Sequence, residues 1–285
     1  MEFHSPDSWR EALEVQAAQP EAVPIFGGTD VMVDLNFDRE RPGAVLDLTR
    51  VPELGEWDED DGRLRVGAGV TYTRIIRELG SELPGLAMAS RTVGSPQIRN
   101  RGTVGGNLGT SSPAGDALPP LYVSDAEVEL ASTNGTRRVP VADFITGPKR
   151  NAMRPDELIA AFHIPRAEGP QQYAKIGTRN AMVIAVCAFG LALRPEQKRV
   201  GACLGSAAPT PVRAREAEEF IEGVLDWDSR GEIGDSELRR FGELVGEAAS
   251  PISDVRGTAA YRTHAVGVLA RRTLGWAWDE YRWGE

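Results

Sequence analysis

The chain has 285 residues, a net charge of −10, and 41% hydrophobic against 26% charged residues. These proportions are ordinary for a globular protein and exclude intrinsic disorder, a collagen-like repeat and a fibrous repeat. The negative charge argues against general nucleic-acid binding, which needs a positive surface, and no apolar run is long enough to span a membrane.

The first fifty residues predict a small βαβ unit. Apolar residues at helical spacing predict a helix over residues 9–19, and a short apolar run predicts a buried strand over residues 22–26. A helix over residues 31–36 and a second strand over residues 44–48 follow. The strands of such a unit are parallel and its crossover is right-handed. The N-terminal segment lacks the apolar core of a secretory signal.

The middle of the chain predicts a mixed α/β region. Strands are expected over residues 64–70, 127–131 and 158–164, helices over residues 72–79 and 86–93, and a hairpin turn at Asn134 and Gly135.

The pattern changes near residue 171, where strands come first and helices follow. We expect strands over residues 173–176, 183–193 and 200–205, then helices over residues 213–225, 236–249 and 258–274. Strands followed by helices indicate an α+β domain. We therefore predict three parts, with bounds at residues 1–55, 56–168 and 169–285.

Several residues have ordinary structural explanations. Cys187 and Cys203 lie in apolar segments, so we expect buried unreactive thiols in a reducing cytoplasm. Two cysteines are too few for an iron–sulfur cluster, and the isolated histidines predict no metal site. The acidic runs at residues 56–61 and 216–222 are interpreted as solvated faces. Packing or an interface is expected to explain three late tryptophans: Trp276, Trp278 and Trp283.

The segment over residues 92–110 is the most informative part of the chain. Glycines recur at positions 94, 102, 105, 106 and 109, and residues 83–115 contain three arginines but no acidic residue. Glycine allows close approach of the backbone to a ligand, and successive amides in such turns bind anions. This pattern favours a phosphate cradle for a dinucleotide. The alternative is a long surface loop in which the glycines only form turns.

A second glycine turn, at residues 26–30, follows a buried strand and precedes a helix. An anion is favoured at such a place, although a tight strand–helix turn explains it equally well. The segment over residues 67–72 fails as a dinucleotide fingerprint because Tyr72 stands where the third glycine belongs. No phosphate-binding Walker sequence and no Gly-x-Ser-x-Gly elbow occurs.

The two glycine segments, residues 26–30 and 94–107, followed by Ser-Pro-Ala-Gly-Asp at residues 112–116, resemble the FAD-binding medium subunit of the molybdenum hydroxylases. Xanthine dehydrogenase and aerobic carbon monoxide dehydrogenase belong to that family. The resemblance covers nearly the whole chain. It implies an α+β fold, with a two-subdomain FAD-binding region of the PCMH, or vanillyl-alcohol-oxidase, type. A C-terminal α+β domain of antiparallel strands and then helices follows that region.

The resemblance also implies which residues bind FAD. The aromatic-x-Lys-x-x-x-Arg segment of the family matches residues 173–179, and its lysine is expected beside the flavin ring. Val183 departs from the family, which often has an aspartate there. No catalytic side chain and no metal ligand is implied, because the chemistry belongs to the cofactor. The expected FAD-binding residues are Pro24, Ile25, Phe26, Gly27, Gly28, Thr29, Asp30, Gly102, Thr103, Val104, Gly105, Gly106, Asn107, Asp116 and Lys175.

On this resemblance the chain is one subunit of a heterotrimer, which is expected to be doubled. Its partners are a large molybdopterin-containing subunit and a small subunit with two [2Fe–2S] clusters, which would supply electrons to FAD for an external acceptor. A free-standing flavin oxidase of the same fold is the first alternative. The absence of a histidine from both glycine motifs disfavours a covalent flavin of the kind such oxidases often carry. A scaffold that has lost FAD is the second alternative, which the intact glycines disfavour.

Overall fold

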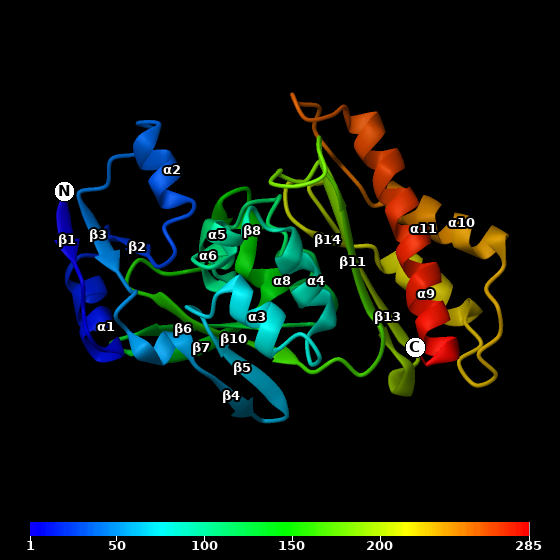
Figure 1. The fold of residues 1–285 in the computed structure, drawn as a ribbon, viewed down its shortest axis with the longest axis horizontal. Coiled ribbons are helices and arrows are strands. Elements are labelled where there is room, and N and C mark those ends of the chain that lie inside the picture. Colours follow the sequence, from blue (N-terminus) through cyan, green and yellow to red (C-terminus); the bar gives the residue numbers. More distant parts are fainter. Residues whose placement is uncertain (285) are drawn as a thin grey trace. The chain divides into compact units, whose positions relative to one another are not determined.

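The structure, a computed structural model, describes residues 1–284 and divides the chain into two compact units (Figure 1). The first unit comprises residues 1–74, 95–111 and 125–165, and the second comprises residues 75–94, 112–124 and 166 onward. The chain first passes from the first unit to the second inside helix α3 (Tyr72–Glu78). The three-part division expected from the sequence stays a prediction.

The N-terminal part of the first unit is a three-stranded parallel sheet in the order β1-β3-β2. Two helices connect its strands, a 3₁₀ helix follows the last of them, and the βαβ unit expected from the sequence is confirmed. The elements are β1 (Glu2–His4), α1 (Trp9–Ala18), β2 (Val23–Ile25), α2 (Val31–Asn36), β3 (Ala44–Asp47) and η1 (Pro52–Gly55).

A five-stranded antiparallel sheet completes the first unit, in the order β4-β5-β10-β6-β7. Its central strand β10 is buried except at its last residue. Ser132 pairs with Gly135, so the expected hairpin turn is confirmed. The elements are β4 (Trp57–Asp60), β5 (Arg63–Gly67), β6 (Glu127–Ser132), β7 (Gly135–Pro140), α8 (Val141–Phe144), β8 (Ile145–Gly147), β9 (Arg150–Asn151) and β10 (Leu158–Pro165).

The glycine-rich stretch after residue 94 is not the long surface loop of the alternative interpretation. It contains helices α5 (Pro96–Arg99) and α6 (Val104–Thr110). The hydroxyl of Ser95 accepts a hydrogen bond from the amide of Ile98, and the hydroxyl of Thr103 accepts one from the amide of Gly106. These caps start both helices, and α6 forms in spite of its three glycines.

The second unit is built on the antiparallel sheet β11-β12-β13-β14. The strands expected from the sequence are confirmed, although the second begins at Cys187 and not at residue 183. The last helix extends nine residues beyond its expected end. The elements are α4 (Pro84–Thr92), α7 (Leu118–Val123), β11 (Gln171–Ile176), β12 (Cys187–Arg194), η2 (Pro195–Gln197), β13 (Arg199–Gly205), β14 (Val212–Arg213), α9 (Arg215–Val224), α10 (Asp235–Glu247) and α11 (Ala259–Trp283).

Both faces of this sheet are covered, and the two faces use side chains of different size. Phe189 and Leu191 of β12 pack in one core with residues of α9, α10 and α11. On the other face, a Cβ added to Gly190 would stand 3.0 Å from the backbone of Pro119 in α7. Small residues therefore let α7 approach the sheet closely, which explains why β12 is apolar on both faces.

The residues assigned to structural roles are mostly as expected. Cys187 and Cys203 are buried free thiols, and burial raises the pKa of both, that of Cys187 to about 12. His163 is fully buried and its Nε2 lies 2.6 Å from Glu129 Oε2. The acidic run at residues 56–61 lies on an exposed strand, as expected.

The prediction for the second acidic run is wrong for one of its members. Glu218 is 1% exposed and forms an ion pair with Arg213. Helical spacing places Glu218 and Glu222 on one side of α9, where their carboxylates accept hydrogen bonds from the β13 amides of Ala202 and Val200.

Candidate functional site

The first glycine turn presents a row of backbone amides. Residues 26–30 connect β2 to α2, and Gly28 has a φ of 70°, which favours glycine. Within residues 1–284, which the structure describes, no hydrogen bond is donated by the amides of Gly27, Gly28, Thr29 or Asp30. Successive amides without an internal acceptor form the kind of concavity that binds an anion.

The second glycine segment is held rigidly. Residues 102–105 are buried, whereas Gly106 is exposed. The amide of Tyr72 donates a hydrogen bond to the carbonyl of Gly102, at 3.0 Å. Val104 has no exposed surface, so its side chain belongs to the core and only its backbone is available to a ligand.

The two glycine segments are in direct contact within the first unit. A Cβ added to Gly27 would overlap the carbonyl of Arg101 and stand 3.0 Å from the amide nitrogen of Gly102. A Cβ added to Gly105 would stand 2.5 Å from the carbonyl oxygen of Ala68. Close backbone packing therefore requires both glycines, and the contact of Gly27 with Arg101 and Gly102 brings together two turns that are more than seventy residues apart in the chain.

Two further glycines in α6 have no such explanation. A Cβ on Gly106 would meet only the Thr103 hydroxyl, at 3.3 Å, and one on Gly109 would meet only Ile159, at 3.7 Å. Glycine inside a helix costs about 1 kcal/mol relative to alanine. Packing within the chain does not require glycine there, so the exposed face of α6 is left open to the approach of another molecule. A phosphate-bearing ligand fits this arrangement of amides and missing side chains.

Asp116 and Lys175 form a polar cluster in the second unit. The ammonium of Lys175 lies 2.6 Å from a carboxylate oxygen of Asp116, and both side chains are about one-tenth exposed. The hydroxyl of Tyr173 donates to Asp116 at 2.9 Å. Burial raises the pKa of Asp116, and the charge of Lys175 with the hydrogen bonds from Lys175, Tyr173 and Thr92 opposes that rise.

Three other predicted residues lie in β2 and α6, and one partner of Lys175 was not predicted. Pro24 is exposed and Ile25 half-buried in β2, and Asn107 is half-buried in α6. The carbonyl of Thr92, which accepts from Lys175 at 3.0 Å, was not predicted. A backbone acceptor that is 83 residues away leaves no signal in the sequence.

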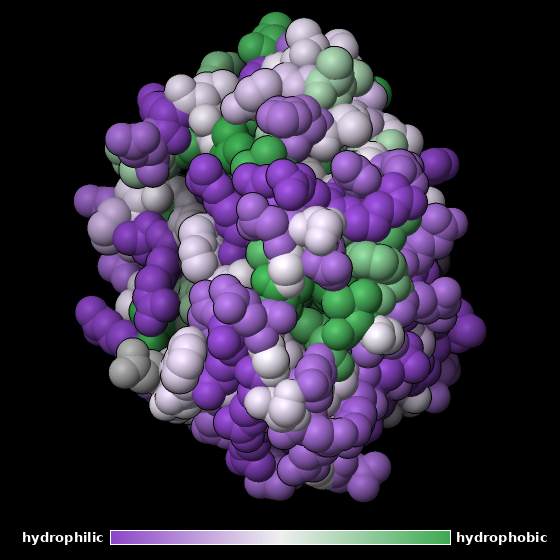
Figure 2. Space-filling view, turned by 90° about the vertical axis from the view of Figure 1, so that its right-hand side faces the viewer, coloured by the Kyte–Doolittle hydropathy of each residue, from purple (hydrophilic) through white to green (hydrophobic). Residues whose placement is uncertain are grey.

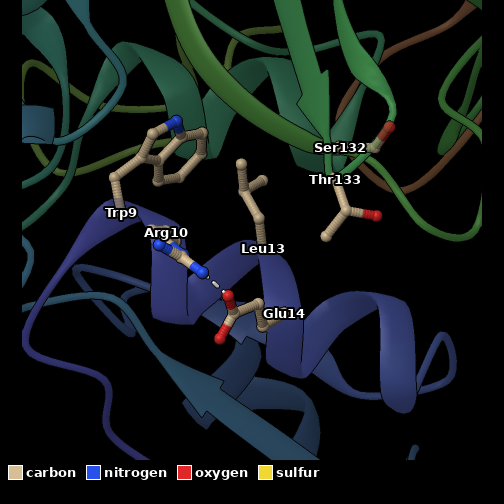
Figure 3. Close-up of a pocket in the computed structure, with 6 residues that line it drawn as sticks. All are labelled: Trp9, Arg10, Leu13, Glu14, Ser132 and Thr133. Atoms are coloured by element: carbon tan, nitrogen blue, oxygen red, sulfur yellow. Dashed lines mark hydrogen bonds and ion pairs between the residues drawn. The ribbon is translucent and has the colours of Figure 1, made fainter.

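A separate groove lies in the first unit between α1 and the β6–β7 turn (Figure 3). It has a volume of about 400 Å³ and contains none of the predicted FAD-binding residues. Arg10 and Glu14 form an ion pair at its edge. It is lined by Trp9, Arg10, Leu13, Glu14, Ser132 and Thr133.

Within residues 1–284, which the structure describes, there is no candidate metal centre and no candidate membrane-spanning helix. These residues contain no group of three or more His, Cys, Asp or Glu residues that could hold a metal ion. No helix in that range is long and apolar enough to cross a membrane.

Comparison with known proteins identifies the family of this chain. A family model described as an FAD binding domain in molybdopterin dehydrogenase matches residues 1–167. A second, described as a CO dehydrogenase flavoprotein C-terminal domain, matches residues 172–277. Together they confirm the expected α+β fold, an FAD-binding region followed by a C-terminal domain.

Individual relatives support the same family assignment. The xanthine dehydrogenase FAD-binding subunit of Escherichia coli O157:H7 is 29% identical over 285 residues, covering 95% of this chain and 94% of the relative. The nicotinate dehydrogenase FAD-subunit of Eubacterium barkeri is 34% identical, covering 78% and 80%. The structure of carbon monoxide dehydrogenase from Hydrogenophaga pseudoflava superposes with a TM-score of 0.89 at 25% identity, covering 98% and 97%. The chain therefore belongs to the family of FAD-binding domains of molybdopterin dehydrogenases and is an FAD-dependent oxidoreductase subunit of the molybdenum hydroxylase type.

Proposed function

We propose that this chain is the electron-transfer subunit of a molybdenum hydroxylase complex. It takes electrons from the [2Fe–2S] clusters of a small partner subunit and passes them to an external acceptor, while a large molybdopterin-containing subunit oxidises the substrate. Bound FAD supplies the redox chemistry, since it accepts and releases electron pairs. The names of the relatives, which are subunits of dehydrogenases, favour this role over a free-standing flavin oxidase.

The open glycine face of α6 is the observation that supports the FAD-binding part of this proposal. Gly106 is exposed, and nothing in its packing requires glycine. The amides of residues 27–30, which have no internal acceptor among the described residues, are proposed to bind the pyrophosphate of FAD. Hydrogen bonds to a charged group contribute about 1.5–3 kcal/mol each, so a few amides suffice.

The other assignments expected from the sequence are part of the same proposal. Residues 24–30 and 102–107 hold the cofactor, with the side chains of Thr103 and Asn107 near its phosphates or ribityl chain, and Asp116 and Lys175 contact it through their side chains. A doubled heterotrimer in the cytoplasm is proposed as well. The two free buried thiols suit a reducing compartment.

The Gly106→Ala variant tests the cofactor site. Alanine at an exposed helix position stabilises the chain without ligand by about 0.5–1 kcal/mol. Its methyl group blocks close approach to α6, so we expect the dissociation constant for FAD to rise about tenfold or more. The measurements are fluorescence titration of the flavin-free protein with FAD and thermal unfolding of the same protein.

Gly223→Ala is the matched control, because it places the same methyl group on an exposed glycine of α9, where a Cβ would meet nothing within 4 Å and no FAD-binding residue is predicted. We expect the same gain in stability and an unchanged affinity for FAD. Wild-type affinity in Gly106→Ala would remove the support for placing FAD at this helix.

The electron-transfer part needs its own measurement. We expect the flavin absorbance of the FAD-loaded chain to bleach when the reduced [2Fe–2S] subunit is added without oxygen, and to recover on addition of an acceptor. Reduction of the flavin by small organic substrates in the absence of both partner subunits would instead support a free-standing oxidase.

A further inference from the structure

Helix α11 carries large aromatic residues on the side that faces away from the core of the second unit. Trp276 is 52% exposed and Trp283 is 69% exposed, whereas Trp278 of the same helix is 1% exposed. Figure 2 shows the face that lies on the right of Figure 1, where hydrophobic side chains gather among hydrophilic ones. Exposed tryptophan and arginine side chains are the residues most enriched at the centres of protein interfaces.

Charged residues alternate with these tryptophans. At about 100° per residue, Arg272, Trp276, Asp279 and Trp283 project within an arc of about 60° on α11. We call these four residues the α11 stripe. All four are exposed. In the part of the chain that the structure describes, Arg272 has no ion-pair partner, and the 61%-exposed Asp279 pairs only with Arg282 of its own helix, at 3.3 Å.

A glycine that folding does not need lies beside the stripe. Of the two glycines inside α11, Gly267 is explained by packing, because its Cβ would stand 2.7 Å from the carbonyl oxygen of Gly242 in α10. A Cβ on Gly275 would meet nothing within 4 Å. Since glycine in a helix costs about 1 kcal/mol, Gly275 indicates a place where another backbone or side chain approaches the helix.

The order of charges along the stripe is self-complementary. Arg272 lies three residues before Gly275, and Asp279 lies three residues after Trp276. A two-fold axis between Gly275 and Trp276 would therefore place Arg272 of one copy opposite Asp279 of the other, twice. The same operation brings Trp283 opposite Val268, which is half-buried. A two-fold interface requires a surface of this kind, which can pair with itself.

We propose that the α11 stripe binds the same stripe of a second copy of this chain, with the two helices antiparallel. The tryptophans supply the apolar contact area and the two Arg272–Asp279 pairs set the register. This interface is independent of FAD and of any other subunit, so the proposal stands or falls separately from the electron-transfer function.

Charge reversal tests the proposal most directly. Analytical ultracentrifugation of the full FAD-loaded chain over a concentration series is expected to show a monomer–dimer equilibrium. Arg272→Glu and Asp279→Arg each place like charges opposite one another, and each is expected to raise the dimer dissociation constant about tenfold or more. The double variant restores opposite charges and is expected to return the constant to nearly the wild-type value.

Two further variants separate a contact effect from damage to the fold. Trp276→Ala is expected to weaken the dimer about tenfold, with flavin content and circular dichroism unchanged, because its side chain is largely exposed. Arg240→Glu is the control: it reverses an exposed arginine on α10 and is expected to leave dimerisation unchanged. A chain that is monomeric at every concentration, or a double variant that fails to recover, overturns the proposal. So does loss of a co-expressed partner subunit from Trp276→Ala while self-association is unaffected.

Discussion

The ammonium of Lys175 donates to three oxygens of its own unit. These are the carboxylate of Asp116 at 2.6 Å, the carbonyl of Thr92 at 3.0 Å and the carbonyl of Val183 at 3.3 Å. An ammonium has three donors, so all of them are used. The position where the family often has an aspartate thus contributes a backbone oxygen here. Lys175 therefore holds the second unit together, whatever it contributes to the flavin.

The structural role of this lysine predicts a large loss of stability in Lys175→Met. The variant leaves the carboxylate of Asp116 buried without its counter-charge, and we expect the free energy of unfolding to fall by about 3–5 kcal/mol. Urea unfolding at pH 7 measures the change. Asp116→Asn combined with Lys175→Met is expected to recover part of the loss. If the free energy of unfolding of the single variant decreased by less than about 1 kcal/mol, this account would be contradicted. The redox potential of bound FAD in the same variant tests the flavin role separately.

Gly105 and Gly106 are adjacent, yet they have opposite surroundings. The Cβ of an alanine at position 105 would stand 2.5 Å from the carbonyl oxygen of Ala68, in a fully buried place. We therefore expect Gly105→Ala to destabilise the flavin-free chain by about 1–3 kcal/mol, the usual range for overpacking. Thermal unfolding without FAD measures this, and a variant as stable as wild type would show that the close approach of Gly105 to the backbone of Ala68 is not required.

At the scale of elements, one face of the five-stranded sheet carries a cluster of paired charges that is largely buried. Glu129 of β6 binds Arg65 of β5 through two hydrogen bonds, of 2.8 and 3.0 Å, and His163 of β10 lies between these strands. Burial would raise the pKa of Glu129, but the hydrogen bonds and charges of His163 and Arg65 outweigh it and lower the pKa to about 2. The ionised carboxylate therefore joins three neighbouring strands.

A lowered pKa makes this contribution to stability depend on pH. It is fully present above the ordinary glutamate value of 4.5 and is lost as the pH falls from there towards about 2. We expect Glu129→Gln to lower the free energy of unfolding by about 1.5–3 kcal/mol at pH 7. The difference from wild type should shrink as the pH falls through that range.

Urea unfolding between pH 7 and pH 3 provides the comparison, with Asp61→Asn as the control. Asp61 is exposed in the β4–β5 turn and has a φ of 52°, which asparagine tolerates. The control is expected to change stability very little. A difference between Glu129→Gln and wild type that is constant with pH would contradict the role given to the ionised carboxylate.

At the scale of the whole molecule, binding of FAD is expected to raise the stability of the folded chain against unfolding. A ligand whose free concentration is one hundred times its dissociation constant stabilises the folded chain by about 2.7 kcal/mol. We expect removal of FAD to lower the melting temperature and added FAD to restore it in proportion to the logarithm of its concentration. Riboflavin, which lacks the pyrophosphate and adenine, is expected to stabilise the chain far less. Equal stabilisation by both would contradict the proposed binding of phosphate by the glycine turns.

The sequence alone determined the features that depend on neighbouring residues. The βαβ unit, the hairpin at Gly135, the strands-then-helices order of the second half and the two glycine segments all follow from local pattern, because helix and strand periodicity and turn chemistry act over a few residues. The resemblance to the FAD-binding subunits rests on the same segments.

Only the tertiary structure decided which distant groups meet. Gly27 touches Arg101, Lys175 pairs with Asp116 and Thr92, and Glu218 is buried although its charged neighbours suggested a solvated face. Such contacts depend on how helices and strands pack, and packing depends on the shapes of surfaces built from residues far apart in the chain. Local periodicity shows that a helix has an apolar and a polar face. Which of the charged residues of the helix are buried and paired depends on the neighbouring element that packs against it.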